Sequence, residues 1–95
     1  MAVYAPPKQF IHLLTQTLNR EGISIKRLAV IPYRYWQVTF PSGSEHFLSW
    51  PYQDLERWHI GTNRYKRCRD NVRNHMRLQF FLAVCLETYV QMLPN

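Results

Sequence analysis

The sequence predicts one α+β domain spanning residues 1–95: an N-terminal helix, a three-stranded antiparallel sheet, a short helix and a long C-terminal helix. Three observations favour this fold. Apolar residues recur at helical spacing near the N-terminus, alternating residues flank a Pro-Ser-Gly-Ser turn, and a long helical pattern follows residue 62. A chain of 95 residues with 46% hydrophobic residues can bury a modest core, but not a core and a separate catalytic domain.

The N-terminal helix is predicted to begin after Pro6-Pro7, because proline is tolerated in the unpaired first turn of a helix. Its apolar residues have helical spacing: Phe10, Ile11, Leu13, Leu14 and Leu18. Gly22 is expected to end it, since glycine adopts the left-handed conformation that closes many helices.

Three strands are predicted over residues 23–31, 35–40 and 45–50, and the last two form a hairpin around residues 41–44. Trp36, Val38 and Phe40 share one face of the middle strand, so we expect this face to pack on the helices. The three tryptophans of the chain are assigned to the core: Trp36, Trp50 and Trp58.

A short helix is predicted over residues 52–60, between Pro51 and Gly61. The long helix is then expected to be capped by Thr62 or Asn63 and to run to about Met92. A helical projection gives it one continuous apolar stripe, made of Tyr65, Cys68, Val72, Met76, Ala83, Leu86 and Val90. Beyond Leu78 the helix is apolar almost all round, so part of its surface is expected to meet the sheet or a second protein.

Cys68 and Cys85 would lie about 25 Å apart in this helix, which is too far for a disulfide bond. Reduced thiols fit a cytoplasmic protein. The N-terminus lacks the pattern of a signal peptide, and the longest apolar stretch is too short to span a bilayer, so no membrane association is expected.

The charge distribution points to an anionic partner. The chain has a formal charge of +6, and seven of its 12 Lys and Arg residues lie between Arg57 and Arg77. The candidate partner- or phosphate-binding residues are these cations and a nearby basic aromatic run: Arg64, Lys66, Arg67, Arg69, Arg73 and Arg77, with Tyr33, Arg34 and Tyr35. The alternative is a solvated basic face that Asp70 partly neutralises by pairing with Lys66 and Arg73.

No enzymatic motif is found, and neither a metal nor a cofactor is expected. The four histidines and two cysteines lack the spacing of metal ligands, and the sequence contains no phosphate-binding loop and no nucleophile elbow. The pattern therefore favours a non-enzymatic protein that modulates a nucleic-acid-processing machine through its basic helix. Direct binding of DNA or RNA by the same arginines is one alternative, and a homo-oligomer formed through the apolar C-terminal helix is another.

In overall character the chain resembles the small anti-RecBCD accessory proteins of lambdoid phages. Two runs carry the resemblance, AVYAPPKQFIHLLTQTLNREGI and NRYKRCRDNVRNHMR. It implies a non-catalytic modulator of a host recombination nuclease such as RecBCD, bound through the RecC subunit, and assigns a role to no single residue. It also implies a host prolyl isomerase as a partner, with candidate sites at Ile31-Pro32, Phe40-Pro41 and Trp50-Pro51.

Overall fold

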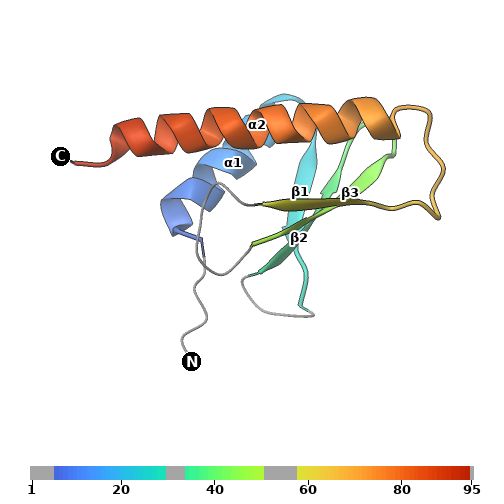
Figure 1. The fold of residues 1–95 in the computed structure, drawn as a ribbon, viewed down its shortest axis with the longest axis horizontal. Helices are drawn as coiled ribbons and strands as arrows, with labels where there is room; N and C mark the ends of the chain where they lie inside the picture. Colours follow the sequence, from blue (N-terminus) through green and yellow to red (C-terminus); the bar gives the residue numbers. More distant parts are fainter. Residues whose placement is uncertain (1–5, 30–33, 51–57, 95) are drawn as a thin grey trace.

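The computed structural model describes residues 6–29, 34–50 and 58–94. Two helices and four strands follow one another: α1 (Lys8–Arg20), β1 (Ser24–Arg27), β2 (Tyr35–Thr39), β3 (Glu45–Ser49), β4 (His59–Thr62) and α2 (Asn71–Met92). The strands form one antiparallel sheet in the order β1-β2-β3-β4, and both helices lie on the same face of it (Figure 1). The α+β class is therefore confirmed, with one strand more than predicted.

The first helix is bounded as the sequence predicts, and the two hairpin strands begin at the predicted residues and end one residue earlier. Pro7 precedes α1, and Gly22 follows it with a φ of 73°. The amide of Ile23 donates to the carbonyl of Leu18, and that of Gly22 to Asn19, the paired bonds of a Schellman motif. In the hairpin turn, Gly43 has a φ of 94° and its amide donates to the carbonyl of Phe40.

The predicted short helix is wrong at its C-terminal end, because residues 59–62 form the edge strand β4. Ile60 and Thr62 are partly buried, whereas His59 and Gly61 are exposed, which is the period of two of a strand. Gly61 pairs with Phe47 of β3 and does not end a helix. Residues 52–57 of the predicted helix lie outside the described residues.

The long helix begins at Asn71, later than predicted, because residues 63–70 form a loop. The amide of Asn63 still donates to the carbonyl of Glu45 on β3, and the amide of Tyr65 donates to the Asn63 side chain, closing an Asx turn. Asp70 takes the N-cap position. Thr62 and Asn63 therefore cap no helix, and Cys68 lies in the loop, so the two cysteines do not share a helix; both are free.

The core lies between the helices and the sheet. Trp36, Val38 and Phe40 face the helices as predicted, and Trp36 and Trp50 are buried while Trp58 packs partly buried against them. From α2 the buried residues are Asn74, Leu78, Leu82, Cys85 and Tyr89.

The apolar stripe predicted for the long helix faces the wrong way. Its members are exposed or half-buried, whereas a second row of residues, which includes Leu78 and Leu82, meets α1 and the sheet. The helix carries two apolar rows, and a projection of the helix alone does not show which of them the rest of the fold covers. Within the described residues, no helix is long and apolar enough to cross a membrane.

Candidate functional site

The loop between β4 and α2 carries most of the predicted basic residues. We call residues 63–70 the basic loop; it lies at one end of the molecule, where β4 leads into the first turn of α2 (Figure 1). The side chains of Arg64, Lys66, Arg67 and Arg69 are all exposed. They occupy a loop and not, as predicted, the first turn of a helix.

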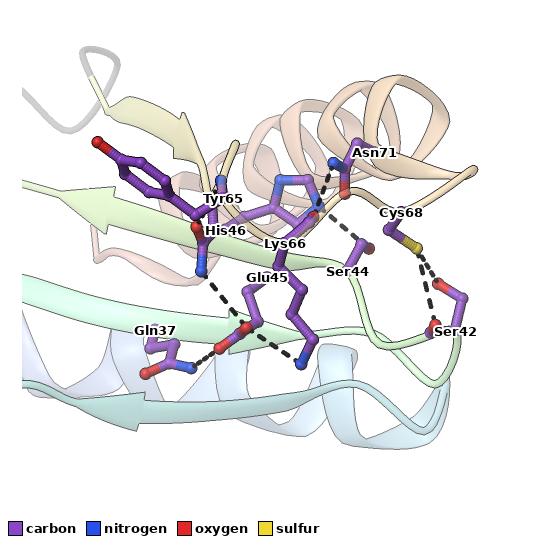
Figure 2. A network of polar contacts seen from close by, with 10 residues as sticks. Gln37, Ser42, Ser44, Glu45, His46, Tyr65, Lys66, Cys68 and Asn71 are labelled. Atoms are coloured by element: carbon purple, nitrogen blue, oxygen red, sulfur yellow. Dashed lines mark hydrogen bonds and ion pairs between the residues drawn. The ribbon is translucent and has the colours of Figure 1, made fainter.

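Contacts with the sheet fix the base of this loop. The Nζ of Lys66 lies 3.2 Å from a carboxylate oxygen of Glu45, whose other oxygen accepts a hydrogen bond of 2.6 Å from the Gln37 amide (Figure 2). The Sγ of Cys68 lies 3.7 Å from the carbonyl oxygen of Ser42 in the hairpin turn. The loop is therefore attached to both β3 and the turn that precedes it.

The arginines of the loop have no carboxylate partner within the described part of the chain. Asp70, expected to pair with Lys66 and Arg73, forms an ion pair with neither among the described residues, and Lys66 is paired with Glu45 instead. Three guanidinium groups, those of Arg64, Arg67 and Arg69, are thus free to bind phosphate or carboxylate oxygens bidentately.

Tyr65 projects from the middle of the basic loop. Its exposed fraction is 101% of the reference value, and it stands between Arg64 and Lys66. Tyr65 was not among the predicted site residues, because the predicted helix placed this ring on a buried stripe. The signal that could have found it is the alternation of basic and aromatic residues, which is typical of nucleic-acid-binding surfaces.

Arg73 and Arg77 lie on α2 but have different surroundings. Arg73 is exposed in a first turn that contains no acidic residue. Arg77 is half-buried, and its guanidinium lies 5.3 Å from the ring centre of Phe40 and 5.7 Å from that of Phe81. Arg77 therefore stabilises the packing of α2 on the hairpin, and its charge is less available to a partner than that of Arg73.

The structure does not place Arg34 and Tyr35 beside the basic loop. Tyr35 pairs with Ser49, whereas the loop adjoins the Thr39–Glu45 end of the same strands, about 13 Å further along. Arg34 donates a hydrogen bond of 3.3 Å to the carbonyl oxygen of Trp50. Tyr33 lies outside the described residues.

Tyr35 and the basic loop nevertheless lie at opposite ends of the same face of the sheet. Since both helices pack on the face that contains Trp36, Val38 and Leu48, the residues that alternate with these along β2 and β3 belong to the opposite face. No helix in the described part of the chain covers this face, which we call the open face. Tyr35 and Phe47, on the two central strands, are diagonal neighbours there and are both partly exposed. Gln37 and Glu45 follow them towards the loop.

A buried polar network joins the hairpin, β4 and α2. The ring of His46 is hydrogen-bonded to the hydroxyls of Ser44 (3.2 Å) and Thr62 (3.1 Å), and Thr62 is bonded to the Nδ1 of His75 (3.0 Å). Asn74 donates to the Ser44 hydroxyl at 2.7 Å. Burial lowers the pKa of His46, and the nearby His75 lowers it further.

This network has the residue types of a catalytic site but not its accessibility. Ser44 and His46 are completely buried, so no substrate can reach the hydroxyl or the ring. The network instead fixes the beginning of α2 against the sheet and leaves these buried polar atoms hydrogen-bonded. Among the described residues, no group of three His, Cys, Asp or Glu side chains could hold a metal ion.

Comparisons with known proteins gave no relative: no family model matches the chain, and no curated protein or solved structure is similar to it. The likeness to anti-RecBCD accessory proteins, with RecBCD and a prolyl isomerase as partners, thus stays a prediction from the sequence.

Proposed function

We propose that this chain is a non-enzymatic protein that binds single-stranded nucleic acid across its open face and basic loop. The observation that carries the proposal is the position of the free arginines and the exposed Tyr65 at one end of a sheet face that contains two further aromatic rings.

The charges supply the first part of the argument. Phosphates are bound by arginines that are exposed and not already paired, and Arg64, Arg67 and Arg69 meet both conditions within the described residues. They lie close together in sequence on one loop, so their fields add at one place. Contacts of this kind give affinity without base preference.

The aromatic rings supply the second part. Tyr35, Phe47 and Tyr65 offer stacking surfaces along a path that leads from one end of the open face to the basic loop. Unpaired bases stack on such rings, and each stack contributes about 1–3 kcal/mol. A duplex keeps its bases stacked inside, so this arrangement favours single strands.

A salt series tests the charge contacts. Binding of a fluorescent oligonucleotide should weaken linearly in a plot of log affinity against log salt concentration, with a slope of about −0.7 per phosphate contact. Replacing Arg64 and Arg67 by Gln should make the slope less steep by about 1.4, because two contacts are lost. Lys8→Gln is the control, since Lys8 is also exposed but lies on α1 in the helix layer. Equal slopes for all three proteins would contradict the proposal.

A pair of substitutions at Tyr35 tests the stacking. Tyr35→Ala should weaken binding to the single strand by about 1–3 kcal/mol, while Tyr35→Phe, which keeps the ring, should leave affinity almost unchanged. Neither change should alter the weaker binding to a duplex of the same sequence. A loss that is equal for single and double strands would show that the open face contacts phosphates only.

The nuclease-modulating function is a second proposal for the same arginines, because guanidinium groups bind carboxylates as readily as phosphates. In this case the partner is an acidic surface of a host nuclease such as RecBCD, in its RecC subunit. The protein should then inhibit degradation of linear duplex DNA at salt concentrations where its binding to oligonucleotides is already lost. Inhibition that disappears together with oligonucleotide binding would favour direct binding to the nucleic acid.

A further inference from the structure

Two adjoining hollows lie between the edge strand β4 and α2. The inner hollow has a volume of about 440 Å³, which is within the range of small-molecule sites. Its apolar walls come from both elements: Ile60, Leu82, Ala83 and Leu86. The outer hollow, of about 280 Å³, reaches the basic loop and is lined by Arg64. The ring of His75 lines both, and none of the described residues that line them is acidic.

The buried polar network assigns the position of each proton, beginning at Asn74. A guanidinium group only donates, so the 3.3 Å bond from Arg77 to Asn74 Oδ1 places the amide nitrogen of Asn74 on the side of Ser44. The Ser44 hydroxyl accepts from this nitrogen, and among the described residues the acceptor for its own proton is Nε2 of His46, 3.2 Å away. Ser44 and His46 are completely buried, where a donor without an acceptor is costly. Nε2 of His46 is therefore the unprotonated ring nitrogen.

The proton of His46 in turn determines the proton of His75. Burial lowers the pKa of His46 and favours its neutral form, so the proton is on Nδ1, which donates to the Thr62 hydroxyl at 3.1 Å. The Thr62 hydroxyl then donates to Nδ1 of His75 at 3.0 Å. Neutral His75 therefore has its own proton on Nε2. This N–H lies on the side of the ring away from Thr62 and has no hydrogen-bond partner within the described part of the chain.

A fixed donor beside apolar walls selects the kind of base that fits the inner hollow. Gln79, one turn after His75 on α2, lines the same hollow, and its side-chain carbonyl can accept a hydrogen bond. Guanine, thymine and uracil present a carbonyl oxygen beside a ring N–H, which matches a donor next to an acceptor. Adenine and cytosine present an amino group at that position, which would turn one donor against another.

We propose that the inner hollow binds one keto base of the bound single strand (guanine, thymine or uracil), with Nε2 of His75 donating to its carbonyl oxygen. The site rests on the proposed function, because this base belongs to the strand that the basic loop holds. Arg64 lines the outer hollow, so a phosphate bound there leads the strand from the loop to the inner hollow. The arginines and exposed rings then hold any sequence, and the hollow selects one class of base.

Oligonucleotides of deoxyuridine and of deoxycytidine, equal in length, test the base selection. Their pyrimidine rings differ only in the carbonyl or amino group and in the adjoining ring nitrogen. The parent protein should bind the deoxyuridine strand about tenfold more tightly, the effect of one buried donor that keeps or loses its acceptor. Equal affinities, with the salt dependence of binding intact, overturn the base site and leave the proposed function standing. Absence of binding to either strand overturns both.

A substitution that fills the inner hollow tests its location. Ala83→Trp places a large ring in the hollow, so the preference for deoxyuridine should disappear while binding to deoxycytidine stays almost unchanged. Val84→Trp is the matched control, since Val84 is the next residue of α2, is also exposed and lines neither hollow. This variant should keep the preference of the parent. A preference that survives in Ala83→Trp overturns the assigned site.

Nitrogen-15 NMR of the labelled protein tests the donor directly, at a pH well above the ordinary histidine pKa of about 6.5. Without nucleic acid, the spectra should show the proton on Nε2 in His75 and on Nδ1 in His46. The deoxyuridine strand should then shift the Nε2 resonance of His75, and the deoxycytidine strand should not. His12, which is exposed on α1, should respond to neither. A proton on Nδ1 of His75, or equal shifts with both strands, overturns the proposal.

Discussion

The two apolar rows of α2 have similar side chains and opposite surroundings. The inner row, which includes Leu78 and Leu82, is completely or almost completely buried against α1 and the sheet. The outer row, which we call the outer stripe and which is formed by Val72, Met76, Phe80 and Val90, remains more than half exposed. Hydrophobicity alone therefore does not decide which side of this helix enters the core. The inner row is buried because it packs against the α1 residues Phe10, Leu14 and Leu18 and against the inner face of the sheet.

The largest expected effect separates the two rows by their contribution to folding. Leu78→Ala should lower the free energy of unfolding by about 2–5 kcal/mol, because it leaves a cavity in the centre of the core. Met76→Ala, only two residues away but exposed, should change it by less than about 0.5 kcal/mol in the monomer. Urea denaturation at a low protein concentration measures both. Equal losses would mean that the outer stripe is also covered within the monomer.

The difference between local signals and contacts with distant residues explains which parts of this fold could be predicted from the sequence. The boundaries of α1 and of the hairpin were predictable, because Pro7, Gly22 and Gly43 act through local backbone geometry. The strand β4 was not, since its stability comes from pairing with β3, and Gly61 at its centre has the appearance of a helix stop.

The candidate site was predictable in composition but not in arrangement. Arginine and lysine are good helix formers, so the pattern of the basic loop continues that of α2 without a visible boundary. The conformation of the loop depends on the Asn63 side chain, which closes the turn at its start, and on the Lys66–Glu45 ion pair, which is a contact with a distant strand. For the same reason Tyr65 was assigned to the interior, and Arg77, which packs on Phe40, to the surface.

The next prediction concerns the first turns of α2, where the inner row is polar instead of apolar. His46, which is linked through Ser44 to Asn74 of this row, has a lowered pKa because it is buried. Below pH 6.5, the unfolded chain therefore binds a proton that the folded chain does not. The free energy of unfolding should be constant above this pH and fall below it, by at most about 1.4 kcal/mol per pH unit, until the folded protein also becomes protonated.

Chemical denaturation between pH 5 and pH 8 measures this slope, and His46→Gln should reduce it. If the slope is the same in the variant, groups other than His46 cause it. If the parent shows no slope, the network at the beginning of α2 accepts the charged ring, and its burial does not favour the neutral form.

The smallest expected effect distinguishes two arginines on neighbouring turns of the same helix. Arg77 lies over the rings of Phe40 and Phe81 and donates a hydrogen bond of 3.3 Å to the Asn74 side chain. Arg77→Ala should therefore lower the free energy of unfolding by about 0.5–1 kcal/mol, the contribution of a partly exposed cation–π contact. Arg73→Ala should change it by only a few tenths of a kcal/mol in either direction, since Arg73 is exposed at the positive end of the helix dipole.

Thermal melts of both variants at a low protein concentration make the comparison. If Arg73→Ala costs as much as Arg77→Ala, the outward side of α2 is stabilised by contacts within the monomer, and the distinction between the two rows does not hold.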